Sequence, residues 1–291
     1  MYIENKLVKK YISLWLIIMF LLVAIIIIVG GLTRLTDSGL SITEWQLFSG
    51  IFPPINHDDW TKYFNLYKKI PEFEIQNYSM TLSEFKVIFW WEYIHRILGR
   101  LIGISFILPL LYFTHKVGFK NLINLYLIFL LICIQGFIGW FMVSSGLVDR
   151  VDVSHFRLSV HLLLAFIILS LILLNFLKLI NVNFPNDNDI KDLFLLDSFD
   201  NPSLVQFIHR NLAYLIFIFY IIILFKIYSS KLLRFFSVIK LIGFFLFLQI
   251  ILGILTLLSG AEIYLSSMHQ ISSIFLVSSS VYFLYLNSNS N

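Results

Sequence analysis

The sequence predicts an all-α polytopic membrane protein, a tandem-repeat helical bundle with about seven transmembrane helices arranged as four plus three. First, 59% of the 291 residues are hydrophobic and only 13% are charged, with a mean hydropathy of +0.87, whereas soluble domains carry about 25% charged residues. Second, apolar runs long enough to cross a bilayer alternate with short polar segments. Third, a set of polar residues in the first half of the chain recurs at a constant spacing in the second half.

Charge and cysteine usage exclude several classes of protein. The net charge of +4 does not indicate nucleic-acid binding, because the Lys and Arg residues lie in short clusters between apolar runs, as the positive-inside rule expects. The single cysteine, Cys133, excludes an intramolecular disulfide and argues against a cysteine-ligated metal site. The basic N-terminus precedes an apolar run without a small-x-small cleavage site, so we expect a retained first helix rather than a signal peptide.

Four helices are expected before residue 180. The first helix should run from the inside of the membrane to the outside, because the N-terminal tail is basic. A long mixed loop over residues 32–86 follows, with short surface helices expected at 61–69 and 82–89. The membrane helices themselves are expected at about 14–29, 91–113, 122–143 and 155–177.

Three further helices are expected at about 202–225, 236–258 and 264–286. The predicted domains are an N-terminal four-helix unit (1–180), a polar connector (181–201) and a C-terminal three-helix unit (202–291). Because the first helix starts inside the membrane, the fourth helix should end inside. The acidic connector and the basic segment 226–240 nevertheless favour a next helix that starts outside. The sequence therefore leaves the orientation of the last three helices open.

The two units are related by a constant shift of 114 positions. This shift maps polar residues and glycines of the first unit onto those of the second: Glu92 on Gln206, His95 on His209, Arg96 on Arg210, Gln135 on Gln249, Gly139 on Gly253, Ser145 on Ser259 and Gly146 on Gly260. His161 falls six places out of step with His269, which a shorter connection between helices explains. Each unit therefore contains two helical histidines.

The recurring histidines are candidate metal ligands. Neutral imidazole ligates haem iron, and two histidines on neighbouring helices form a bis-His haem site in a bundle. A single buried histidine is more often a hydrogen-bonded core residue, but the recurrence of a pair in both units favours ligation. The predicted ligands are His95, His161, His209 and His269.

Glu92 distinguishes the two units, because its counterpart is the neutral Gln206. A carboxylate one turn from a haem ligand in one unit alone indicates chemistry at that site, either by orienting water or by stabilising a cationic intermediate. An interfacial glutamate at a helix start, favoured by the helix dipole, explains Glu92 equally well. Arg96 and Arg210 are either snorkelling cations or partners of haem propionates.

Glutamine and glycine residues are predicted to join the helices. Gln135 and Gln249 are the expected interhelical hydrogen-bonding groups, and Gly136, Gly139 and Gly253 are expected to allow close helix packing.

Four stretches together resemble the haem A synthase family: residues 30–41 (GGLTRLTDSGLS), Glu92-x-x-His95-Arg96, residues 135–140 (QGFIGW) and residues 205–210 (VQFIHR). The resemblance covers nearly the whole chain. It is closest to the class shared by Gram-negative bacteria and mitochondria, which lacks a cysteine pair in the first outer loop.

The resemblance implies oxidation of the C8 methyl of haem O to the formyl of haem A, for cytochrome oxidase assembly. It implies that His95 and His161 hold the substrate haem O, that His209 and His269 hold a resident haem b, and that Glu92 is catalytic. It also implies a bacterial or mitochondrial inner membrane, with haem O synthase and a second copy of the chain as candidate partners and no nucleic acid. The family has eight helices, and this chain lacks the fifth with its following outer loop.

Two other functions are compatible with four helical histidines. One is a membrane di-haem b electron carrier, and the other is an inactive haem-binding assembly factor. The contrast between Glu92 and Gln206 favours the enzyme, because a pure electron carrier has no need of this asymmetry.

Overall fold

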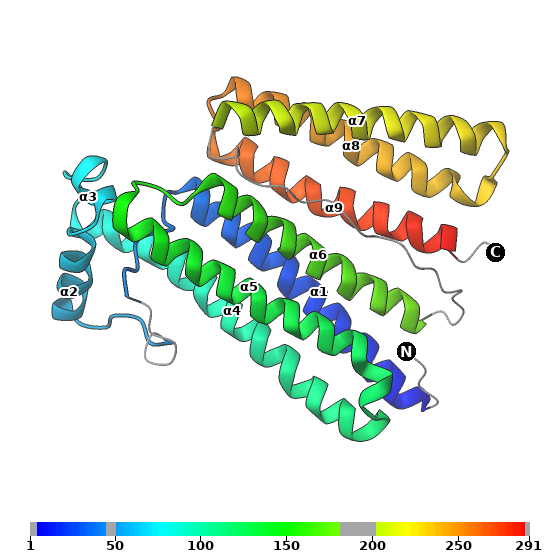
Figure 1. Ribbon diagram of the computed structural model, residues 1–291, viewed down its shortest axis with the longest axis horizontal. Helices are drawn as coiled ribbons and strands as arrows, with labels where there is room; N and C mark the ends of the chain where they lie inside the picture. The colour runs from blue at the N-terminus through cyan, green and yellow to red at the C-terminus, as the bar shows by residue number, and fades with distance from the viewer. Residues whose placement is uncertain (1–4, 45–50, 181–201, 289–291) are drawn as a thin grey trace. The chain divides into compact units, whose positions relative to one another are not determined.

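The computed structural model describes residues 5–44, 51–180 and 202–288, and every regular element within these ranges is a helix (Figure 1). The predicted all-α class is confirmed for this part of the chain. The elements are α1 (Lys6–Leu35), α2 (His57–Tyr67), α3 (Pro71–Ile75), α4 (Leu82–Val117), η2 (Phe119–Leu122), α5 (Ile123–Asp149), α6 (His155–Ile180), α7 (Pro202–Ser229), η3 (Leu233–Phe235), α8 (Phe236–Leu258) and α9 (Ile263–Ser288).

Six helical segments among the described residues are long and apolar enough to cross a membrane. These candidate spans are Lys6–Leu35, Leu82–Val117, Phe119–Val148, His155–Ile180, Leu212–Ser229 and Leu233–Leu258. α9 forms the seventh predicted helix in the expected place, but its many serines make it less apolar and it is not among the six. The protein is thus an integral membrane protein, and a seventh crossing by α9 stays a prediction.

The start of α4 differs from the sequence prediction. A surface helix over 82–89 and a membrane helix from residue 91 were expected, whereas the structure has one continuous helix from Leu82. Thr81 begins it with a capping box, in which its side chain accepts from the Glu84 N–H and the Glu84 carboxylate accepts from the Thr81 N–H at 2.7 Å. No Gly or Pro interrupts the following residues, so the helix continues into the apolar run.

Residues Asn5–Leu169 form one compact unit. In it α1 packs along α4, and α4 also packs against α5 (Figure 1). Apolar side chains fill this contact, and the Trp15 indole N–H of α1 donates to the Ser105 carbonyl of α4 at 2.9 Å. The close pairing of α1 and α4 places the C-terminal end of α1 beside the part of α4 that carries Glu92 and His95.

An aromatic cap covers the N-terminal part of α4. α2 and the following turn pack on it through Trp60, Phe64 and Tyr67, which contact Phe85 and Phe89. The surface helix expected at 61–69 is therefore present, although it begins at His57, because the Asn56 side chain accepts from the Asp59 N–H. Leu40 and Ile42 belong to the same apolar cluster, so the segment after α1 is held against α4.

The described residues from Ser170 onward form a second compact unit. α8 packs along α9 and against α7, around an apolar cluster formed by Ile227, Phe235, Val238, Ile239 and Ile242. The boundary between the two compact units lies within α6, whereas the sequence prediction placed it after residue 180. The predicted connector 181–201 lies outside the described residues, and the division into 1–180, 181–201 and 202–291 stays a prediction.

Candidate functional site

Both predicted histidines of the N-terminal unit lie against glycine backbone. A Cβ atom on Gly30 of α1 would lie 3.1 Å from His95 Nε2, and a Cβ on Gly139 of α5 would lie 3.1 Å from His161 Cε1. His161 is close enough to His95 for the two imidazoles to interact electrostatically. The neighbouring helices therefore need glycine at these two positions in order to seat the rings.

The C-terminal unit repeats this arrangement. A Cβ on Gly253 of α8 would lie 3.0 Å from His269 Cε1, and the rings of His209 and His269 are 6.3 Å apart with an interplanar angle of 74°. Gly139 and Gly253 are the glycines that the 114-residue shift relates. α5 continues far beyond Gly139 to Asp149, whereas α8 ends soon after Gly253 at Leu258, which accounts for the six-residue offset of the histidines.

The predicted interhelical role of the two glutamines is confirmed. Gln135 Nε2 donates to the His161 carbonyl at 2.9 Å and so joins α5 to α6. Gln249 Nε2 lies 3.3 Å from His269 Nε2, and Ser272 Oγ donates to Gln249 Oε1. Each glutamine thus fixes the helical turn that carries the second histidine of its unit.

The second histidine of each unit has a ring nitrogen that no protein group satisfies. Within the described residues, His161 Nδ1 and His269 Nδ1 are both buried without a hydrogen-bond partner. Buried polar atoms of this kind are rare and call for an explanation. No three His, Cys, Asp or Glu side chains gather as ligands for a bare metal ion in the described ranges. Paired imidazoles seated on glycine fit the axial ligation of haem iron.

Glu92 is buried in α4, with 3% of its surface exposed. Its Oε2 accepts from Ser41 Oγ and from the Ile42 N–H, both at 2.7 Å. Its Oε1 accepts from Arg96 Nε at 3.0 Å and from Arg96 Nη2 at 2.5 Å. These donors occupy the approximately four lone-pair directions of an ionised carboxylate.

Arg96 ties this carboxylate to the segment after α1. Its Nη2 also donates to the Ile42 carbonyl at 2.9 Å, and the ion pair with Glu92 is nearly buried. The guanidinium therefore faces Glu92 and loop carbonyls, and the predicted propionate contact of Arg96 stays a prediction. Arg210 is exposed in the C-terminal unit, and its propionate contact likewise stays a prediction.

The interpretation of Glu92 as a dipole-stabilised residue at a helix start is wrong. α4 begins at Leu82, so Glu92 lies about three turns inside the helix, where the dipole effect has faded. The side chain of its counterpart Gln206 lies outside the described residues. The predicted asymmetry therefore rests on residue identity, and on the Glu92 contacts in the N-terminal unit.

Sequence reasoning missed three contributors to this site: Gly30, Ser41 and the Ile42 N–H. All three lie in or directly after the GGLTRLTDSGLS stretch, to which the sequence alone assigns no role. A helix end and a simple turn do not require a specific sequence of this length. The length of the motif was therefore the sequence signal that its residues have a further role.

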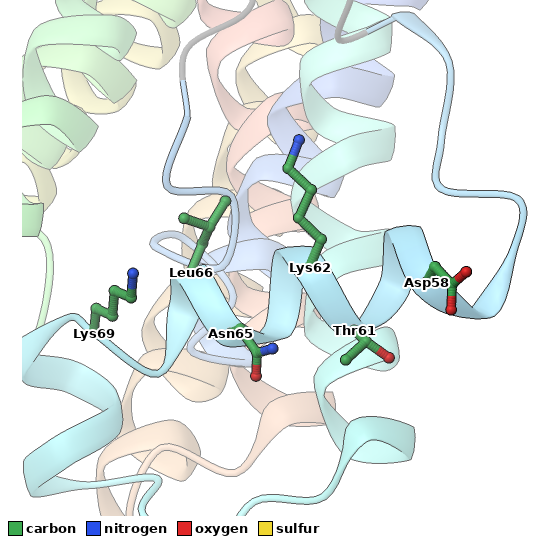
Figure 2. Close-up of a pocket in the computed structure, with 6 residues that line it drawn as sticks. All are labelled: Asp58, Thr61, Lys62, Asn65, Leu66 and Lys69. Carbon is green, nitrogen blue, oxygen red and sulfur yellow. The ribbon is translucent and has the colours of Figure 1, made fainter.

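One surface depression lies elsewhere and includes none of the predicted site residues. It is lined by residues of α2 and its C-terminal end: Asp58, Thr61, Lys62, Asn65, Leu66 and Lys69. Figure 2 shows that Lys62 and Leu66 project to one side of α2, whereas Thr61 and Asn65 project to the other. These side chains do not converge on a common point, so the depression is not a candidate active site.

Comparison with known proteins gives a consistent result. A family model described as cytochrome oxidase assembly protein, COX15-CtaA, matches residues 13–194 and again residues 181–281. A heme A synthase of Pelagibacter ubique is 46% identical over 345 positions that cover both chains completely. A heme A synthase of Rickettsia bellii is 39% identical and covers 97% of this chain and all of its own length. No solved structure matches.

The double match agrees with the tandem repeat found from the sequence and with the recurring glycine–histidine contacts. The Pelagibacter alignment has 345 positions and this chain has 291 residues, so that relative contains segments without a counterpart here. The match to the family model and the full-length similarity to these relatives show that this chain belongs to the COX15-CtaA family of cytochrome oxidase assembly proteins.

Proposed function

We propose that this protein is a haem A synthase, an oxidoreductase that converts the C8 methyl of haem O into the formyl of haem A. The observation that carries this proposal is the buried Glu92 network one helical turn from His95, in a chain whose full-length relatives are heme A synthases. The relatives are bacterial, which supports a bacterial inner membrane as the location. Haem O synthase and a second copy of the chain remain predicted partners.

His95 and His161 bind the substrate haem O in the N-terminal unit, and His209 and His269 bind a resident haem b in the C-terminal unit. The supporting observations are the glycine contacts in both units and the unsatisfied ring nitrogens of His161 and His269. When bound, haem b supplies one-electron transfer. This assignment uses the predicted division into an N-terminal unit of residues 1–180 and a C-terminal unit of residues 202–291, with α9 crossing the membrane as the seventh helix.

Glu92 acts through its charge. Conversion of a methyl to a formyl group takes its oxygen atom from one water molecule and releases four protons and four electrons, which an electron acceptor must take up. Where electrons leave the substrate before protons, positive charge develops beside the porphyrin edge. A carboxylate whose four acceptor directions are already occupied has no open position to accept a hydrogen bond from water. Of the two roles predicted from the sequence, the arrangement therefore favours electrostatic stabilisation over the orientation of water.

The test is expression of the full chain with a supply of haem O, followed by extraction of the pigments and mass analysis. We expect haem A together with haem b. Glu92→Gln is the matched variant, since it makes the first unit resemble the second at this position. It should retain bound haem but form about 10²–10³-fold less formyl product, the range expected for loss of an electrostatic stabiliser.

Three results would contradict the proposal. Haem b without haem A would indicate an electron carrier. Haem O recovered unchanged from the purified protein would indicate an inactive assembly factor. Wild-type turnover in Glu92→Gln would remove Glu92 from the chemistry.

A further inference from the structure

The segment after α1 is shaped to reach α4. α1 ends at Leu35, and Asp37 adopts a left-handed conformation with φ of 46°. The Ser38 N–H then bonds the Thr33 carbonyl at 2.9 Å, which closes the helix end and turns the chain. Thr33 Oγ1 also lies 3.3 Å from the Trp91 carbonyl, so this helix end is anchored on α4. Residues after the turn are therefore delivered to the turn of α4 that carries Glu92.

Ser41 is fully buried at this contact, with 1% of its surface exposed. Its hydroxyl lies 2.7 Å from Glu92 Oε2 and 3.3 Å from the Ile88 carbonyl. A hydroxyl has one proton, and the shorter distance and the negative charge both favour donation to the carboxylate. Glu92 Oε2 is thus held by one backbone N–H, that of Ile42, and by one side chain that mutation can remove.

Loss of the Ser41 hydroxyl would leave Oε2 with the Ile42 N–H alone. Arg96 would still hold Oε1 and would still balance the charge. Haem binding through His95 and His161 would not be affected directly, because Ser41 contacts neither histidine in any described interaction. The direction of the carboxylate would be less well fixed, and preorganised direction is what electrostatic catalysis depends on.

We propose that Ser41 is a positioning residue for the oxidation of the haem O methyl, acting by fixing the orientation of the Glu92 carboxylate. This inference rests on the proposed function. It assigns a role to the serine that ends the GGLTRLTDSGLS stretch, which includes the end of α1 and the turn after it.

Ser38 offers a matched control. It lies in the same segment and is equally buried, but its hydroxyl pairs with Thr36 at 2.6 Å and no described interaction joins it to Glu92. A general loosening of the segment would affect Ser38→Ala and Ser41→Ala alike. A specific effect on Glu92 would separate the two variants.

The experiment measures haem A formation by the full chain across a titration of haem O. We expect Ser41→Ala to lower kcat about 10–100-fold, somewhat less than loss of a complete oxyanion donor, with KM for haem O unchanged within about twofold. Ser38→Ala should stay close to wild type, and Ser41→Thr should recover activity because it retains the hydroxyl. Wild-type kcat in Ser41→Ala, or equal losses in the two alanine variants, would each overturn the proposal.

Infrared spectroscopy separates this proposal from the proposed function. The carboxylate bands of Glu92 are identified by their disappearance in Glu92→Gln. We expect these bands to shift in Ser41→Ala and to stay in place in Ser38→Ala. Unchanged bands in Ser41→Ala overturn the positioning role whatever the activity. A band shift in a protein that makes no haem A overturns the proposed function instead, and with it the link of Ser41 to that reaction.

Discussion

Three glycines decide how closely the helices approach the candidate ligands. Gly30, Gly139 and Gly253 each lie where a Cβ atom would come within 3.0 to 3.1 Å of an imidazole ring atom. Contacts this short are tighter than most that real Cβ atoms make, so alanine at these positions requires the ring to shift by a few tenths of an ångström. Close helix packing was the expected reason for Gly139 and Gly253, and the structure shows that the packed group is a histidine side chain.

At this scale we predict that Gly139→Ala weakens haem binding in the N-terminal unit. The added methyl must push the His161 ring, and overpacking typically costs about 1–3 kcal/mol, which corresponds to a loss of affinity of about 5-fold to 150-fold. Haem titration followed by the low-spin absorption spectrum measures the effect.

Gly136→Ala is the control for that prediction, because a Cβ on Gly136 meets nothing within 4 Å. It lies on the same helix and introduces the same methyl group. Equal haem affinity in the two variants would show that the Gly139–His161 contact has no bearing on ligation.

At the scale of elements, the cap formed by α2 and α3 contains a buried acid. Glu72 is 2% exposed, and its Oε1 accepts from Tyr67 Oη at 3.1 Å. Burial raises the pKa of Glu72 to about 8, and the negative charges of Glu92 and Asp37 add to this, whereas the Tyr67 hydrogen bond and Arg34 act in the opposite direction. Burial also raises the pKa of Tyr67, so the phenol remains a donor.

The cap should therefore loosen at alkaline pH. The pKa of Glu72 is higher in the folded cap than its ordinary value of 4.5, so its contribution to stability is complete below that value and is lost as pH rises through about 8. Hydrogen exchange of the α2 and α3 amides, compared at each pH with that of Glu72→Gln, should show faster opening in the wild type above pH 8.

Glu74 in the same short helix is exposed and provides the control for this pH dependence. Glu74→Gln should keep the wild-type response to pH, whereas Glu72→Gln should abolish it. The ratio of amide hydrogen-exchange rates in α2 and α3 between the wild type and Glu72→Gln should change between pH 6 and pH 9. A constant ratio would refute a buried, protonated Glu72.

At the scale of the whole molecule, the repeat raises the question of how the last three helices insert. Four preceding crossings that begin inside would place the start of α7 on the inside. The positive-inside rule instead favours the C-terminal end of α7 on the inside, because basic residues follow it: Lys226, Lys231, Arg234 and Lys240. We expect the charge bias to prevail, so that all four histidines lie near the outer side of the membrane.

Single-cysteine labelling in a Cys133→Ser background measures this orientation. Ser198→Cys should react with an impermeant reagent from the outside, and Ser229→Cys should react from the inside. Ser198 lies outside the described residues, and its expected side follows from charge alone. The reverse labelling pattern would mean an inverted C-terminal unit, with its histidines on the inner side.

The sequence by itself determined the membrane class, the places of the apolar helices, the tandem repeat and the candidate histidines and glutamate. Hydropathy is a sum over neighbouring residues, and a repeat preserves local order, so both can be read along the chain. The start of α4 was also encoded locally, in the capping box of Thr81 and Glu84. The apolar pattern alone placed the start of the membrane helix later, at about residue 91.

Only the tertiary structure decided which groups surround the site residues. Ser41 and Ile42 lie about fifty residues from Glu92 in the chain, yet they hold one oxygen of its carboxylate. Gly30 lies still further from His95 in the chain and forms the surface on which that ring rests. Periodicity within one helix says which face a residue occupies but not which segment will meet that face. That choice depends on how α1 and α4 pack and on the turn that directs the chain after α1 toward α4.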